Sequence, residues 1–341
     1  TGRFNDTLMG GSGNDGFSSG AGDDYVDGGA GIDTIVYAYE SLTQGVTVDL
    51  SLNTAQLINA GAGYDTLLNI ENAYGTVFAD QLKGSDANNK FQGGLGNDTI
   101  DGEASNDSVL GGDGEDSLLG GTGNDSIDAG SDSDTLIGGS GNNRLAGGSG
   151  DGPRGDWVSY DWQTGAVSAT LGGTARGESF NDTLIGFEAI VGGSGNDTLV
   201  GENGGNATGE TILGADGNDS LSGVSGIDYL DGGNGNDTLE GGTENDTLLG
   251  GSGTDLASYA SATSAITVDL GTGSSAGALG NDTLSTIENI LGGNSNDSII
   301  GNDVANELSG GLGRDTIIGG DGDANRYVHL TSSLFFFYLI A

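Results

Sequence analysis

Aspartate recurs at every ninth residue over long stretches of this 341-residue chain, and this spacing is the feature best suited to chemistry. Carboxylates at a fixed period form a column of hard oxygen ligands, which suits a divalent cation better than an acid–base pair. Each aspartate is the sixth residue of a nonapeptide GGxGxDxUx, where U is apolar, as in residues 93–100 (GGLGNDTI). The aspartates at this position, called position six below, are Asp6, Asp15, Asp24, Asp33, Asp80, Asp98, Asp107, Asp116, Asp125, Asp134, Asp197, Asp219, Asp228, Asp237, Asp246, Asp255, Asp297 and Asp315.

The rest of the nonapeptide predicts how these aspartates are positioned. Glycines allow the positive φ angles of a tight turn, and the last three residues form a minimal strand. The middle residue of that strand is apolar, as at Ile100 and Leu118, and points inward, while polar neighbours such as Thr99 point outward. Two nonapeptides complete one coil, so Asp98 and Asp116 stack directly. We therefore expect an all-β fold, a parallel β-roll or β-solenoid with three longer divergent β inserts, and no long helix.

The predicted stacking favours calcium. Like charges about 4.8 Å apart repel unless a cation lies between them. Ca²⁺ takes six to eight oxygen ligands from carboxylates and carbonyls, whereas Mg²⁺ demands a smaller octahedron and Zn²⁺ lacks its nitrogen and sulfur ligands here. Several Ca²⁺ ions are expected, held by the position-six aspartates and by turn carbonyls. The turn carbonyls predicted as ligands belong to Gly94, Gly96, Gly112, Gly114, Gly121, Gly123, Gly233 and Gly235.

Composition supports a cation-loaded repeat protein. The chain has 71 glycines, one proline and a formal charge of −42, which would repel nucleic acid and anionic membranes. It has no cysteine, which excludes disulfides and thiolate metal sites. The only strongly apolar run, residues 334–341, is far shorter than the roughly 20 residues of a membrane span. Because Thr1 falls in mid-repeat, we expect a fragment or a processed product.

A longer unit interrupts the nonapeptides three times. Each copy begins with an aspartate followed four residues later by a tyrosine, continues with an alternating strand-like segment (residues 45–50, 166–171 and 265–270), and ends before a new position-six aspartate. The predicted supermodules are 1–155 (insert 34–79, array 80–152), 156–254 (insert 156–196, array 197–254) and 255–325 (insert 255–296, array 297–325), followed by an apolar tail or cap, 326–341.

Some residues depart from the pattern. Asparagine at position six (Asn89, Asn143, Asn206 and Asn306) or alanine (Ala324) predicts weak or empty sites. Four extra residues near 208–211 predict a bulging loop. In the inserts, metal-ligand and turn-forming roles are equally expected for Asp65, Asp182 and Asp282. Flanking acids are expected to be solvated, namely Asp23, Asp113, Glu115 and Asp132.

The copies GGSGND (residues 10–15 and 192–197), GGLGND (93–98), GGTGND (120–125) and GGNGND (232–237) resemble the RTX, or hemolysin-type, calcium-binding repeats of type I-secreted bacterial proteins. The resemblance extends over nearly the whole chain. It implies a parallel β-roll that folds on calcium, with position six and the turn carbonyls as ligands. It also implies an extracellular or cell-surface location.

Catalysis is not expected. His329 is the only histidine, and the motifs HExxH, GxSxG and the P-loop are absent from the sequence. Aromatic residues gather in the inserts, where they could form exposed carbohydrate or protein contacts or could cap a widened core. They are Tyr37, Trp157, Tyr160, Trp162 and Tyr259.

We therefore expect a calcium-binding structural segment of an adhesin, S-layer or filament protein, which folds after export. Self-association and binding to polysaccharide or a cell surface are the expected partner contacts. The alternative is a non-catalytic targeting or substrate-binding module of a secreted lipase, protease or alginate-epimerase type enzyme. Sequence preceding Thr1 that holds HExxH, GxSxG or a β-helix catalytic domain would favour this alternative.

Overall fold

The computed structural model describes residues 3–37, 42–59, 61–149, 155–203, 209–320, 322 and 326–328. Strands and turns make up this described part of the chain, which contains no helix and so no helix able to span a membrane. The predicted all-β class is confirmed. Asn206, Thr208, Ala324, His329 and the apolar run 334–341 lie outside the described residues.

Contacts divide the chain into two compact units. Unit 1 comprises Thr1–Ser159 and Gly172–Phe187, and unit 2 comprises Tyr160–Leu171 and Glu188–Ala341. This division crosses the second predicted insert, and the three supermodules stay a prediction made from sequence.

Within its described residues, unit 1 contains nineteen short strands. They are β1 (Thr7–Ser12), β2 (Gly16–Phe17), β3 (Tyr25–Ala30), β4 (Thr34–Val36), β5 (Thr47–Asp49), β6 (Gln56–Asn59), β7 (Gly63–Leu68), β8 (Asn72–Tyr74), β9 (Gln81–Lys83), β10 (Lys90–Leu95), β11 (Thr99–Asp101), β12 (Ser108–Asp113), β13 (Ser117–Leu119), β14 (Ser126–Ser131), β15 (Thr135–Ile137), β16 (Arg144–Ser149), β17 (Trp157–Ser159), β19 (Thr174–Arg176) and β20 (Asn181–Ile185).

Unit 2 contains the remaining seventeen. They are β18 (Ser168–Thr170), β21 (Ala189–Val191), β22 (Thr198–Val200), β23 (Thr211–Leu213), β24 (Ser220–Ser222), β25 (Tyr229–Asn234), β26 (Thr238–Glu240), β27 (Thr247–Ser252), β28 (Leu256–Ser258), β29 (Thr267–Asp269), β30 (Ser274–Ala276), β31 (Thr283–Ser285), β32 (Asn289–Leu291), β33 (Ser298–Ile300), β34 (Glu307–Ser309), β35 (Thr316–Ile318) and β36 (Arg326–Val328).

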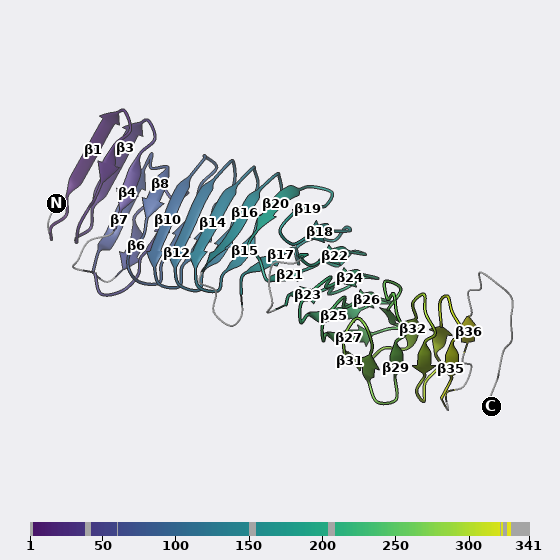
Figure 1. The fold of residues 1–341 in the computed structure, drawn as a ribbon. Helices are drawn as coiled ribbons and strands as arrows, with labels where there is room; N and C mark the ends of the chain where they lie inside the picture. The colour runs from purple at the N-terminus through teal and green to yellow at the C-terminus, as the bar shows by residue number, and fades with distance from the viewer. Residues whose placement is uncertain are drawn as a thin grey trace. The chain divides into compact units, whose positions relative to one another are not determined.

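Strands from alternate nonapeptides form two parallel sheets within unit 1, as the coils from β8 to β16 in Figure 1 show. β10 pairs with β12 in the register Phe91↔Val109, and β11 pairs with β13 in the register Ile100↔Leu118. Both registers advance by eighteen residues. The predicted coil of two nonapeptides, with one strand on each sheet, is therefore confirmed. In unit 2 the same register joins β25 to β27 through Leu230↔Leu248.

The core between the two sheets of unit 1 is one side chain thick. Ile100 and Leu118 of one sheet and Val109 and Ile127 of the other are buried, while Thr99 is exposed. This is the strand alternation that the sequence predicts. Each nonapeptide thus buries one large apolar side chain, so the hydrophobic stabilisation per coil is small.

Glycine makes the turns between the sheets possible. Gly94 has a φ of 126° and Gly96 a φ of 100°, in the region that side chains with a Cβ disfavour. Both turn residues lie on the path from β10 to Asp98.

The inserts contain the strands that the sequence predicts. β5, β18 and β29 fall within the predicted strand-like segments, and each joins a parallel partner. The inserts also add antiparallel pairs, such as β6 with β7 and β29 with β30. They therefore widen the core beyond one apolar residue per strand.

Aromatic residues of the inserts belong mainly to the core. Tyr37, Tyr160 and Tyr259 are buried, so of the two alternatives the capping of a widened core holds for them and the exposed contact surface does not. Each ring fills the space where an insert replaces a nonapeptide. Trp157 is half-buried and Trp162 is 37% exposed.

Replacing Leu118 by Ala should lower the free energy of unfolding of the calcium-loaded protein by about 2–5 kcal/mol, because it opens a cavity in a core one residue thick. Leu118 is 1% exposed. Leu110, which is 38% exposed, is the matched control, and its replacement by Ala should change the free energy by about 0.5 kcal/mol or less. Denaturant unfolding measures both, and equal losses would contradict the assigned core.

Candidate metal centre

The position-six aspartates lie in the turns with their carboxylates inside the protein. Asp6, Asp15 and Asp315 are half-buried. The others are buried, namely Asp24, Asp33, Asp80, Asp98, Asp107, Asp116, Asp125, Asp134, Asp197, Asp219, Asp228, Asp237, Asp246, Asp255 and Asp297. Because burying a carboxylate is costly, each needs partners that stabilise its charge.

One oxygen of each carboxylate joins successive coils. The backbone N–H of Asp98 donates to Oδ1 of Asp116 over 2.8 Å, and the N–H of Asp116 donates to Oδ1 of Asp134 over 2.7 Å. Unit 2 repeats the contact between Asp219 and Asp237 at 2.8 Å. The aspartates thus form columns along the coils, as predicted, and Oδ1 needs no further partner.

The second carboxylate oxygen, Oδ2, differs from Oδ1 in its hydrogen-bond partners. In many of these aspartates it is buried, and no hydrogen-bond donor among the described residues reaches it. These are Asp15, Asp24, Asp33, Asp98, Asp107, Asp116, Asp125, Asp134, Asp219, Asp228, Asp237, Asp246 and Asp255. An ionised carboxylate only accepts hydrogen bonds, and a buried acceptor without a partner costs about 1–3 kcal/mol. A cation beside Oδ2 would remove that cost.

The first glycine of the nonapeptide leaves the space beside Oδ2. A Cβ on Gly120 would lie 2.6 Å from Oδ2 of Asp125 and 2.5 Å from the carbonyl oxygen of Gly138 in the next coil. A Cβ on Gly102 would similarly lie 2.6 Å from Oδ2 of Asp107. The unpartnered carboxylate oxygen and a backbone carbonyl therefore face one cradle, which any side chain would fill. The sequence prediction missed this glycine, whose backbone needs no positive φ.

The glycines predicted to supply carbonyl ligands all have positive φ. Some of their carbonyls already join coils, since Gly121 accepts the N–H of Ser140 over 2.9 Å. Their role as ligands stays a prediction. The carbonyl that shares the cradle with Oδ2 belongs to the first glycine of the nonapeptide in the next coil, eighteen residues later. The predicted set is Gly94, Gly96, Gly112, Gly114, Gly121, Gly123, Gly233 and Gly235.

Burial disfavours the ionised form of these carboxylates. It raises the pKa of Asp98 to about 7, and the charges of Asp80 and Asp116 raise it further against the opposing hydrogen bond from Asp80. Burial likewise raises the pKa of Asp134 to about 8, with repulsion from Asp116 and Asp156. A bound divalent cation would reverse this preference.

Three aspartates at the ends of the inserts have protein partners for both oxygens. Asp80 accepts the N–H of Val46 at Oδ1 over 2.6 Å and the N–H of Thr76 at Oδ2 over 2.5 Å. The same two-sided arrangement holds Asp197 and Asp297. We call Asp80, Asp197 and Asp297 the boundary aspartates.

The insert aspartates have a third arrangement. Asp65 Oδ2 accepts the hydroxyls of Tyr37 over 2.8 Å and Ser19 over 3.0 Å. Asp282 Oδ2 accepts the hydroxyl of Tyr259 over 2.9 Å. Burial raises the pKa of that tyrosine, so the phenol stays protonated and donates. The tyrosine hydroxyl thus stabilises the charge of Oδ2, as a cation would at the position-six aspartates.

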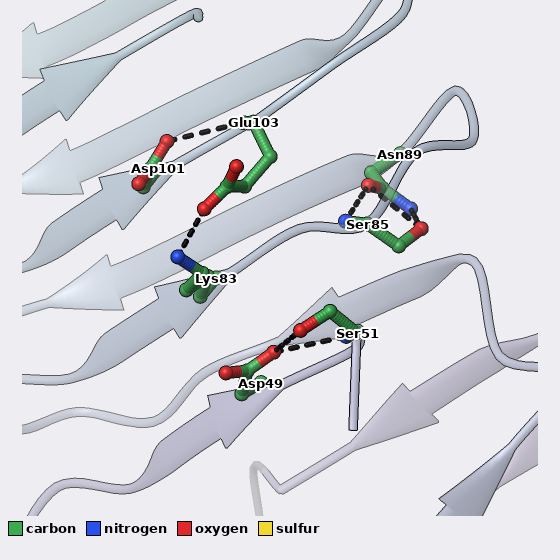
Figure 2. A network of polar contacts seen from close by, with 7 residues as sticks. All are labelled: Asp49, Ser51, Lys83, Ser85, Asn89, Asp101 and Glu103. Atoms are coloured by element: carbon green, nitrogen blue, oxygen red, sulfur yellow. Dashed lines mark hydrogen bonds and ion pairs between the residues drawn. The ribbon is translucent and has the colours of Figure 1, made fainter. Parts of the chain in front are cut away.

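Asparagine at position six donates hydrogen bonds through its side-chain amide to backbone carbonyls. The side-chain N–H of Asn89 donates to the carbonyl of Glu71 over 2.7 Å, and that of Asn306 donates to the carbonyl of Glu288 over 2.7 Å. Asn143 donates more weakly to Gly139 at 3.4 Å. These contacts give a physical reason for the predicted weak or empty sites. Figure 2 shows the Asn89 turn with Ser85, whose N–H donates to Oδ1 over 2.8 Å.

Figure 2 also shows polar contacts on the outer surface nearby. Lys83 pairs with Glu103, and this contact raises the pKa of the lysine. The side chain of Asp49 accepts from Ser51. Lys83, Glu103 and Asp49 are half-buried and lie outside the carboxylate columns.

Sequence reasoning missed the glutamates at position six, among them Glu71, Glu288 and Glu210. Oε2 of Glu71 accepts the N–H of Asp33 over 2.8 Å, and Oε2 of Glu288 accepts the N–H of Asp255 over 2.9 Å. Stepping back eighteen residues from Asn89 and Asn306 would have found both. The third of these is Glu210, nine residues before Asp219, in the place predicted for Asn206.

Flanking acids are exposed as predicted, namely Asp23, Asp113, Glu115 and Asp132. Among the described residues, no three His, Cys, Asp or Glu side chains form a metal-binding group. An ion in these turns must therefore combine carboxylate oxygens with backbone carbonyls. Calcium accepts such an all-oxygen set, and the unpartnered Oδ2 atoms and the glycine cradles fit it.

The fold and these turns define a parallel β-roll with cation-binding carboxylates. A family profile described as "RTX calcium-binding nonapeptide repeat (4 copies)" matches residues 1–35, 74–109, 83–118, 110–145, 119–152, 173–206, 222–257 and 291–323. These matches cover more than half of the sequence, so the chain belongs to the RTX calcium-binding repeat family. Calcium is the ion that these repeats bind.

Among solved structures, the chain is similar to the "X-ray crystal structure of a hyperactive, Ca2+-dependent, beta-helical antifreeze protein from an Antarctic bacterium". The identity is 20%, over 93% of this chain and 83% of that chain, with a TM-score of 0.21. A TM-score this low supports no conclusion about function. No curated protein matches the chain.

Acidic pH should stabilise the calcium-free protein. The pKa values of Asp98 and Asp134 in the folded chain, about 7 and about 8, exceed the ordinary 3.8. The folded state then binds protons more tightly than the unfolded state, so the stabilisation is complete below about pH 4 and is lost as pH rises through about 7–8. In chelator, circular dichroism should show more strand at pH 5 than at pH 8. Less strand at pH 5 would contradict the carboxylate burial.

Proposed function

We propose that the chain is an extracellular, calcium-binding structural segment of a bacterial surface or secreted protein, of adhesin, S-layer or filament type. The observation that carries the proposal is the column of buried carboxylate oxygens without hydrogen-bond donors. Membership of the RTX family supports calcium as the ion.

The proposed mechanism couples calcium binding to folding. In low cytosolic calcium, the charge of −42 expands the chain, and folding would bury carboxylates without partners. In millimolar extracellular calcium, each ion neutralises carboxylates and joins adjacent turns. The binding free energy then becomes folding free energy.

We propose that the position-six aspartates with an unpartnered Oδ2 are the main ligands, together with turn carbonyls. They are densest in two blocks, Asp98 to Asp134 and Asp219 to Asp255. The boundary aspartates bind calcium weakly, because backbone N–H groups already satisfy both oxygens.

The segment is proposed to have no catalytic centre of its own. Calcium binding accounts for the position-six carboxylates, which would otherwise be the candidates for acid–base chemistry. A structural role for the repeated coils follows, with self-association or a cell-surface polysaccharide as the proposed partner contacts.

A calcium titration tests the coupling of binding and folding. Far-UV circular dichroism should show a cooperative gain of strand signal as calcium rises to millimolar concentration, and excess chelator should reverse it. Magnesium at equal concentration is the control and should give a much smaller change. Strand signal that persists unchanged in chelator at neutral pH would reject the proposal.

A pair of matched substitutions tests the ligand assignment. Asp116→Asn removes the charge of an unpartnered carboxylate and should lower the number of bound calcium ions by at least one. Asp80→Asn makes the same chemical change at a boundary aspartate and should leave the number unchanged. Native mass spectrometry counts the ions, and Asn89 indicates that asparagine fits position six. Equal losses in both variants would show that the two kinds of carboxylate do not differ.

A further inference from the structure

Glu210 occupies position six of a coil that the nonapeptide pattern does not describe. Its N–H donates to Oδ1 of Asp228 over 2.7 Å, and its carbonyl accepts the N–H of Tyr229 over 2.9 Å. Asp228 makes the same two contacts with the following coil, through Asp246 and Thr247. Glu210 is therefore a member of the carboxylate column.

The coil that contains Glu210 is larger than a regular coil of two nonapeptides. Asp197 and Asp219 stack in adjacent coils although twenty-two residues separate them, against eighteen between Asp219 and Asp237 in the next coil. Gly201 takes the place of the first glycine, because its N–H donates to Ser222 over 2.8 Å as Gly223 donates to Glu240 over 2.9 Å. The enlargement thus falls between Gly201 and Glu210.

The carboxylate of Glu210 has the features of the unpartnered aspartates. The residue is 3% exposed, and its Oε2 has no hydrogen-bond donor among the described residues. A Cβ on Gly201 would lie 2.6 Å from the carbonyl oxygen of Gly223 and 3.4 Å from Oε2 of Glu210. Oε2 and that carbonyl therefore face one cradle, which is somewhat wider than at Gly120.

Negative charge surrounds this carboxylate. Burial raises the pKa of Glu210 to about 8, together with a side-chain hydrogen bond to Asp228 and repulsion from Asp228, Glu202 and Glu188. Ion pairs among the described residues join only Lys83 with Glu103 and Arg326 with Glu307, so none neutralises Glu210. A cation from solution would stabilise the ionised form of this buried carboxylate.

We propose that Glu210 is a calcium ligand, acting with the carbonyl of Gly223 and continuing the calcium column through the enlarged coil. The additional methylene lets the carboxylate reach the cradle from the longer turn. This inference rests on the proposed calcium-dependent function, but it assigns a site to a residue outside the Asp-based repeat.

Counting calcium ions on the full chain by native mass spectrometry tests the assignment. Glu210→Gln keeps the length of the side chain and removes its charge, so it should bind one ion fewer than the unchanged protein. Glu202→Gln is the matched control, because Glu202 is exposed nearby, and it should keep the full number. Glu210→Asn is a second variant, which mimics the asparagines found at position six.

Asp237→Asn distinguishes a failure of the Glu210 assignment from a failure of the proposed calcium ligands as a whole. If Asp237→Asn loses an ion and both Glu210 variants keep the full number, the assignment of Glu210 is wrong and the proposed function stands. If Asp237→Asn also keeps the full number, the proposed ligand set itself fails. Circular dichroism in saturating calcium should show unchanged strand content in Glu210→Gln, and a loss of ions accompanied by loss of strand there would overturn the assignment.

Discussion

The structure depends on one electrostatic constraint, which is that most turns of the arrays bury a carboxylate oxygen beside the turn of the next coil. Oδ1 is satisfied by a backbone N–H, as between Asp98 and Asp116, but this leaves Oδ2 without a donor. A core one side chain thick supplies little hydrophobic stabilisation to offset that cost. Folding of the arrays and binding of cations should therefore be coupled, because a cation would stabilise the carboxylates that folding buries.

In the inserts, protein hydroxyl groups donate hydrogen bonds to the buried Oδ2 atoms. Oδ2 of Asp65 accepts from Tyr37 and Ser19, and Oδ2 of Asp282 accepts from Tyr259 and Ser275. The inserts also bury additional apolar residues, such as Ile58 and Ile287, which have no counterpart in the nonapeptides of the arrays. Protein hydrogen bonds and a wider core thus replace the cation where an insert replaces nonapeptides. We therefore expect calcium dependence to differ along the chain, strong in the arrays and weaker at the inserts.

Much of this could be predicted from sequence, because a period of nine determines both the strand and the turn. The nine-residue period placed Ile100 in the core and Asp98 in the turn. Two periods, or eighteen residues, gave the register Ile100↔Leu118. Such reasoning fails where the step is interrupted. Glu210 was missed because four extra residues precede it, and the burial of Tyr37 was only one of two alternatives, because the pattern does not show how far an insert widens the core.

The first glycine of the repeat shows a further limit of pattern reading. Gly94 and Gly96 attract notice because their positive φ explains why they are glycine. Gly93 has no such backbone requirement, because its reason lies in the space that a Cβ would fill, which the carboxylate of Asp98 in the same turn and the carbonyl of Gly111 in the next coil approach. The part of this requirement that comes from the next coil leaves no mark within one nonapeptide. We therefore expect a cation site to need two stacked turns rather than a single repeat.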